Sequence, residues 1–141
     1  MHNPKVIDGK NISIYQLNDF FSHVTEMLLE HFDVEVRKGD VFVVGPYVQE
    51  GVESIKERFP GRKLVAYQLE QMMGIGNWRR SSSIIENLKG YDELWDYDPL
   101  NAHYLGQHGI KVDRVVPMLH TASLERIISS HEPKKIGRAH V

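Results

Sequence analysis

Four short loops carry the polar and aromatic side chains that are best placed for chemistry, because each follows an apolar run typical of a buried strand. The loops are Gly45-Pro46-Tyr47, Gln68-Leu69-Glu70-Gln71, Tyr97-Asp98 and Pro117-Met118-Leu119-His120. In an open α/β sheet, ligands bind in the crevice beyond the carboxyl ends of the strands, and loops there are free to carry function. The sequence therefore predicts a binding site for a hydroxyl-rich ligand at these loops.

Glu70 is the candidate catalytic residue. Its carboxylate directly follows a buried strand, where it could accept a proton from an acceptor hydroxyl or orient a sugar. The alternative interpretation is a negative charge that favours the N-terminus of a following helix. Gly45 could serve a close approach of the backbone or only a tight turn, and Asp98 fits a helix cap better than a catalyst. The full set of candidate substrate-binding residues is Gly45, Tyr47, Gln68, Gln71, Asp98 and Asn101.

The sequence lacks the familiar signatures of nucleotide-binding and metal-binding sites. There is no GxGxxG motif after the first strand and no GxxxxGKS/T motif, and Gly74-Ile75-Gly76 lacks the third glycine. The chain has no cysteine, and its eight histidines lack the paired spacing of a zinc-binding helix. We therefore predict neither a metal nor a cofactor in this chain, and we keep His120 as the only histidine that could act as an acid or base.

A cluster of cations, an indole and hydroxyls runs from Trp78 to Ser83. Such a cluster could hold a phosphate at a helix N-terminus, although a solvated loop that enters a capped helix explains the same residues. Ser83 and Glu86 match a capping box. We therefore expect Gln71 to Arg80 to be irregular and a helix to run from Ser83 to a point near Gly90.

Apolar runs and helical periodicity alternate along the chain. Further helices are predicted from Phe20 to Phe32, from Val48 to Phe59, and from Asp98-Pro99 to a stop at Gly109. Strands are predicted at 6–7, 12–15, 41–44, 64–67, 93–97 and 112–116. An alternation at intervals of about 25 residues favours parallel neighbours joined by crossover helices. The predicted fold is a single α/β domain, a Rossmann-like parallel sheet with helices on both faces.

Composition and charge exclude several classes of protein. The 141 residues suit one domain, and 41% hydrophobic with 26% charged residues are ordinary globular values. No apolar run approaches the roughly 18 to 20 residues of a membrane span, and Met1-His2-Asn3-Pro4 begins no signal peptide. A net charge of -2 gives no overall attraction to nucleic acid. We expect a cytoplasmic protein with no nucleic-acid partner and no transmembrane segment.

A series of motifs extends from Tyr67 to Ile127. Tyr67-Gln68-Leu69-Glu70-Gln71 precedes Tyr91-Asp92-Glu93-Leu94-Trp95-Asp96-Tyr97-Asp98, and Asn101, Leu105, Gly109 and Val116-Pro117 follow. The series resembles the N-terminal half of GT-B glycosyltransferases, which have two Rossmann-like domains. It is similar to the bacterial and viral branch related to spore-maturation glycosyltransferase-like proteins, in which YxLEQ precedes VWDYSxxN and then VPxG. Asp98 departs from that pattern by replacing the usual Ser, and Met118-Leu119 replaces the expected glycine.

The resemblance implies a function and a domain organisation. In this family the N-terminal domain shapes the acceptor side of the cleft, and the C-terminal domain binds most of the nucleotide-sugar donor. Residues 1–128 would thus be the acceptor-side domain, 129–135 would begin a linker, and the partners would be a missing C-terminal domain and a carbohydrate or other hydroxyl-bearing acceptor. Positive groups and helix N-termini, rather than a metal, would stabilise the departing phosphate. The full-length parent would be the enzyme, and this piece alone would be inactive.

The final segment, 136–141, fits a translated sequencing adaptor, since Ile-Gly-Arg-Ala-His-Val corresponds to ATC GGA AGA GCA CAC GTC. An ordinary polar C-terminus is the alternative. We expect the natural chain to continue past Lys135. Two rival functions are a stand-alone flavodoxin-like module that binds a nucleotide or a partner without catalysis, and a sugar-nucleotide epimerase. The epimerase would need a Tyr with a Lys four residues later, and no Tyr here has one.

Overall fold

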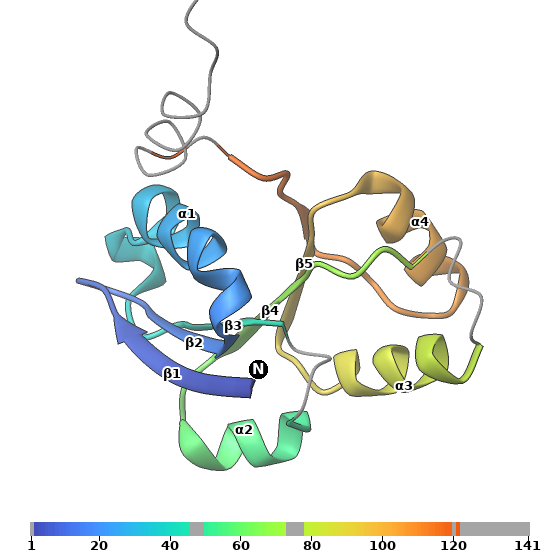
Figure 1. Ribbon diagram of the computed structural model, residues 1–141, viewed down its shortest axis with the longest axis horizontal. Helices are drawn as coiled ribbons and strands as arrows, with labels where there is room; N and C mark the ends of the chain where they lie inside the picture. Colours follow the sequence, from blue (N-terminus) through green and yellow to red (C-terminus); the bar gives the residue numbers. More distant parts are fainter. Residues whose placement is uncertain (1, 46–49, 73–77, 120, 122–141) are drawn as a thin grey trace, which may run out of the picture.

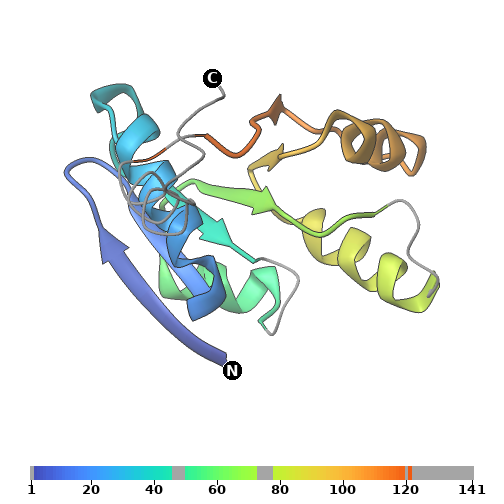
Figure 2. The same cartoon turned by 45° about the horizontal axis from the view of Figure 1, so that its top comes forward.

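The computed structural model describes residues 2–45, 50–72, 78–119 and 121, which form one α/β unit (Figure 1). Its sheet has six strands in the order β1-β2-β3-β4-β5-β6. The strands are β1 (His2–Asp8), β2 (Ser13–Asn18), β3 (Val41–Val44), β4 (Leu64–Gln68), β5 (Glu93–Asp96) and β6 (Arg114–Val115). The strands from β2 to β6 pair in parallel, whereas β1 pairs antiparallel with β2 at the edge of the sheet (Figure 2). The predicted fold class is thus confirmed, with one antiparallel edge strand.

Helices interleave with the parallel strands. They are α1 (Ser22–Phe32), α2 (Val52–Arg58), α3 (Trp78–Leu88) and α4 (Pro99–Gln107), with short 3-10 turns η1 (Asp19–Phe21) and η2 (Glu35–Arg37). The predicted cap of α4 is confirmed, because the Asp98 side chain accepts a hydrogen bond from the Leu100 N–H and Pro99 begins the helix. Gly109 has φ of 81°, as its predicted role as a left-handed stop requires.

The predicted start of the third helix was wrong. The helix α3 already begins at Trp78, so Ser83 lies in its interior and cannot be a cap. Ser83 is exposed, and the exposed Glu86 forms an ion pair with Lys89 at 2.9 Å instead of turning back to the backbone. A serine followed by a glutamate three residues later is compatible with either position, because both side chains can face solvent in mid-helix. The last two strands are also shorter than predicted, since β5 ends at Asp96 and β6 covers only Arg114–Val115.

Alternate residues of each strand face two separate halves of the core. One half contains α1 together with Phe42, Tyr67 and Trp95. The other half contains α2, α3 and α4, packed against residues such as Val43 and Leu94. Figure 1 shows α1 on one face of the twisted sheet and the other three helices on the opposite face. The chain therefore leaves β2 toward one face and leaves β3 toward the other.

Candidate functional site

The carboxyl ends of β4 and β5 are joined by a buried polar network. The Asp96 carboxylate accepts hydrogen bonds from Gln68 Nε2 at 2.8 Å, from the Asp98 N–H at 2.9 Å and from Asn101 Nδ2 at 3.2 Å. The side chains of Gln68, Asp96 and Asn101 are all 0% exposed. Parallel register places Gln68 beside Asp96, and the cap of α4 brings Asn101 over both. We call Gln68, Asp96 and Asn101 the amide–carboxylate network.

The network holds the loop that contains Glu70. The Glu70 carbonyl accepts hydrogen bonds from Gln68 Nε2 and from Asn101 Nδ2, each at 2.9 Å. The Glu70 N–H donates to Gln68 Oε1, and the Met72 N–H donates to Asn101 Oδ1 at 3.0 Å. Three residues predicted from sequence to share a site, Gln68, Glu70 and Asn101, are therefore brought together.

Asp96 is a buried anion whose donors are neutral. Burial raises the pKa of the Asp96 carboxyl to about 6, and the neighbouring Asp98 carboxylate acts in the same direction. The hydrogen bonds from Asp98, Gln68 and Asn101 lower the pKa but do not outweigh burial. Asp96 is consequently ionised at neutral pH, although its pKa lies well above the ordinary value for an aspartate.

Acidic side chains lie near the phenol of Tyr97. Burial raises the pKa of Tyr97, and the charges of Asp98, Asp96 and Glu70 raise it further. Glu70 and Asp98 are half-buried, whereas Gln71 is exposed. The edge formed by the loops after β4 and β5 thus presents carboxylates and a phenol, which can accept hydrogen bonds from hydroxyl groups.

Gly45 lies one strand away, at the end of β3. Its φ is +82°, and a Cβ atom built on it would lie 2.5 Å from the Phe21 ring. The residue therefore makes the predicted left-handed turn and leaves room for the Phe21 ring, whereas its role in binding a ligand stays a prediction. Tyr47, His120, the predicted linker at 129–135 and the final segment at 136–141 lie outside the described residues.

Asp96 was missed as a site residue by sequence reasoning. We assigned it to a core strand, and a strand residue that follows Leu94 and Trp95 gives little indication of which face it occupies. The available signal was the charge itself, because an unpaired aspartate is rarely fully buried. Gln68 lies 28 residues before Asp96, so only the strand pairing brings the two together. Asn101 is five residues after Asp96 and reaches it because α4 begins directly after Asp98.

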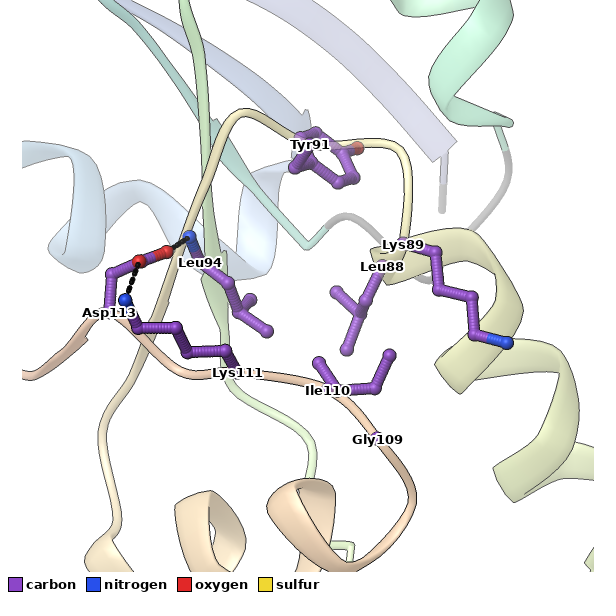
Figure 3. A pocket seen from close by; sticks show the side chains of 8 residues that line it. All are labelled: Leu88, Lys89, Tyr91, Leu94, Gly109, Ile110, Lys111 and Asp113. Atoms are coloured by element: carbon purple, nitrogen blue, oxygen red, sulfur yellow. Dashed lines mark hydrogen bonds and ion pairs between the residues drawn. The ribbon is translucent and has the colours of Figure 1, made fainter.

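A pocket of about 160 Å³ lies at the opposite end of the sheet (Figure 3). Leu88, Leu94 and Ile110 line it with the ring of Tyr91, while Asp113 binds the Leu94 N–H at 2.8 Å at its rim. The Tyr91 hydroxyl is buried without a hydrogen-bond partner. Among the predicted site residues that the structure describes, none lines this pocket. The pocket and the amide–carboxylate network are therefore separate features.

Among residues 2–45, 50–72, 78–119 and 121, no group of three or more His, Asp or Glu side chains is arranged to hold a metal ion. No helix in that same part of the chain combines the length and apolar character needed to cross a membrane. No protein-family profile, curated protein or solved structure matches the chain. The structure thus establishes an α/β domain with a mostly parallel six-stranded sheet.

Proposed function

We propose that this chain is the acceptor-side domain of a GT-B glycosyltransferase that transfers a sugar from a nucleotide-sugar donor to a hydroxyl-bearing acceptor. One observation carries the proposal. The two motif segments around Gln68 to Gln71 and Asp96 to Asn101 lie on neighbouring parallel strands, and the amide–carboxylate network bonds them together at the carboxyl edge of the sheet. That edge is where α/β sheets bind ligands.

The charge of this edge favours an acceptor over a nucleotide. The carboxylates of Asp98, Asp96 and Glu70 are all near enough to Tyr97 for their charges to raise its pKa. A negative edge attracts hydroxyl donors but repels a pyrophosphate. We therefore assign acceptor binding to the loops after β4 and β5, and Glu70 the role of the base that takes the acceptor proton. Binding of the donor phosphates belongs to the second domain of such an enzyme.

Acceptor binding can be tested on the chain itself. A ¹⁵N-labelled sample is titrated with a panel of oligosaccharides and simple glycosides, and amide shifts are followed by NMR. We expect shifts at 69–71 and 97–101. Glu70→Gln should weaken binding, whereas Glu86→Gln, an exposed change on α3, should leave it unaltered. Shifts confined to the pocket residues Leu94 and Ile110 would contradict the assignment, and shifts with a nucleotide alone would favour the stand-alone module.

Catalysis is tested in the complete reading frame. Sugar transfer is measured for the wild-type enzyme and for Glu70→Gln. Loss of a general base lowers kcat by roughly 100-fold or more, so a drop of about that size is expected. Asp98→Ser should retain transfer, because serine keeps the helix cap. Undiminished transfer by Glu70→Gln would remove Glu70 from the active site.

A further inference from the structure

We infer that Asp96 is a positioning residue, whose buried carboxylate orients Gln68 and Asn101 so that their amides clamp the Glu70 peptide between β4 and α4. The clamp follows from the contacts alone. Only the statement that it positions a reacting group rests on the proposed function, since that function gives Glu70 its role.

The first argument is the direction of each hydrogen bond. An ionised carboxylate only accepts, so Asp96 turns Gln68 Nε2 and Asn101 Nδ2 toward itself. The same two nitrogens then donate to the Glu70 carbonyl. The amide oxygens are left to face the N–H groups of Glu70 and Met72. Every donor and acceptor in the clamp is matched only when residue 96 presents acceptors on both of its oxygens.

The second argument is the number of donors. Three donors converge on Asp96, two on Oδ1 and one on Oδ2. An asparagine at this position would have a single acceptor oxygen and would turn its NH₂ group against a donor. A fully buried anion held by neutral donors is costly, and stability alone does not require it. The carboxylate is therefore best explained by the geometry that it imposes on its neighbours.

Several titratable groups face Asp96. Tyr67 and Glu70 lie on the β4 side, and Tyr97 and Asp98 follow Asp96 in the chain; the charge of Asp96 raises the pKa of both tyrosines. Because the pKa values of Tyr67 and Tyr97 are raised above the ordinary 10.0, neither phenol titrates near pH 6. A titration near pH 6 that is seen at the Glu70 and Asp98 amides and is lost in Asp96→Asn consequently reports Asp96.

The test is amide hydrogen exchange and pH titration by NMR on wild type, Asp96→Asn and the control Asp98→Asn. Asparagine is also a good helix cap, and residue 98 does not contact Gln68 through its carboxylate. In Asp96→Asn we expect exchange at Glu70 and Met72 to accelerate at least about tenfold more than at Val65 and Ala66, the scale of one lost hydrogen bond. Asp98→Asn should show no such difference.

Two results would overturn the clamp. One is equal acceleration at the loop and strand amides of Asp96→Asn, and the other is a wild-type titration in which the Glu70 and Asp98 amides have no common midpoint. The second measurement needs no variant, so it can overturn the clamp even when Asp96→Asn does not fold. If the amides shift on titration with an acceptor but the clamp is overturned, the proposed function still stands. If the clamp is confirmed but no acceptor shifts are seen, the positioning of the Glu70 peptide stands and the proposed glycosyltransferase function is contradicted.

Discussion

The two ends of β5 bury acidic side chains in opposite ways. At the amino end, Glu93 accepts hydrogen bonds from Arg37 at 3.1 and 3.3 Å and from the Trp95 indole at 2.6 Å, and Lys63 forms an ion pair with it at 2.8 Å. At the carboxyl end, Asp96 has three neutral donors. Burial raises the pKa of both groups, but the partners of Glu93 outweigh burial and lower its pKa to about 2, whereas that of Asp96 rises to about 6.

The difference separates a structural end of the sheet from a candidate functional end. Arg37 also binds Asp40 at 3.0 Å and lies over the Trp95 ring at 5.1 Å from its centroid, so the amino end is an ionic network fitted around aromatic side chains. The carboxyl end keeps an anion that no cation compensates within the network. Groups with raised or lowered pKa mark both kinds of region, and the charge of the partners distinguishes them here.

The largest expected effect is at the amino end. Glu93→Gln should lower the free energy of unfolding by about 3 kcal/mol at pH 7, because it removes the anion from Arg37 and Lys63. The folded pKa is depressed from 4.5 to about 2, so this stability is present above about pH 4.5 and is lost as the pH falls toward 2. Urea unfolding from pH 3 to 7 measures the change.

The exposed pair of Glu86 and Lys89 provides the control for Glu93. Glu86→Gln should change stability by less than about 0.5 kcal/mol. Similar losses in the two variants would show that the amino-end network is no stronger than a surface ion pair.

Asp96→Asn should give the opposite dependence on pH. The folded pKa is raised from 3.8 to about 6, so the contribution of Asp96 is fully present below about pH 4 and is lost as the pH rises through 6. Wild type should thus lose about 3 kcal/mol relative to the variant over that interval. The variant itself is destabilised by about 1 to 3 kcal/mol at every pH, because its amide NH₂ group faces a hydrogen-bond donor. Parallel stability curves of the two proteins would contradict the raised pKa.

Two glycines with a left-handed backbone, one at each end of the sheet, allow a second comparison. Gly45 follows β3 with φ of +82°, and Gly61 precedes β4 with φ of +75°, but only at Gly45 would a Cβ atom contact another side chain. Gly61→Ala should cost about 1 kcal/mol for its left-handed backbone, and Gly45→Ala about 2 kcal/mol because the Phe21 ring must also move. Thermal or urea unfolding measures both. Equal losses of stability in the two variants would show that the Phe21 ring moves aside without a cost.

The smallest effect concerns the cap beside Asp96. Asp98→Ala should cost about 1 kcal/mol of stability, and Asp98→Ser should restore most of it. Both changes remove a charge that raises the pKa of Asp96, so the titration midpoint of Asp96 should fall in both variants. A midpoint that falls in neither variant would show that Asp98 does not influence its neighbour, whatever the change in stability.

Much of the fold could be predicted because its signals are local. Phe42 and its neighbours form an all-apolar run that fits only a sheet covered on both faces. Asp98-Pro99 and Gly109 determine the ends of α4 through their own backbone preferences. The antiparallel pairing of β1 was left open, because Asp8-Gly9 could form either a turn or a loop. The four residues between β1 and β2 are too few for a parallel crossover, so the two strands pair antiparallel. The start of α3 was misplaced, because Ser83 can either cap a helix or face solvent within one.

The amino-acid sequence by itself determined the alternation of strands and helices, the caps and the polar loops at the strand ends, since each depends on residues within a few positions of one another. Only the tertiary structure decided that Asp96 meets Gln68 and Asn101, and that Phe21 covers Gly45. These contacts depend on the register of β4 against β5 and on the face toward which each helix turns. Register and burial belong to the packed sheet, and they turn an aspartate in a strand into a buried anion that holds two loops together.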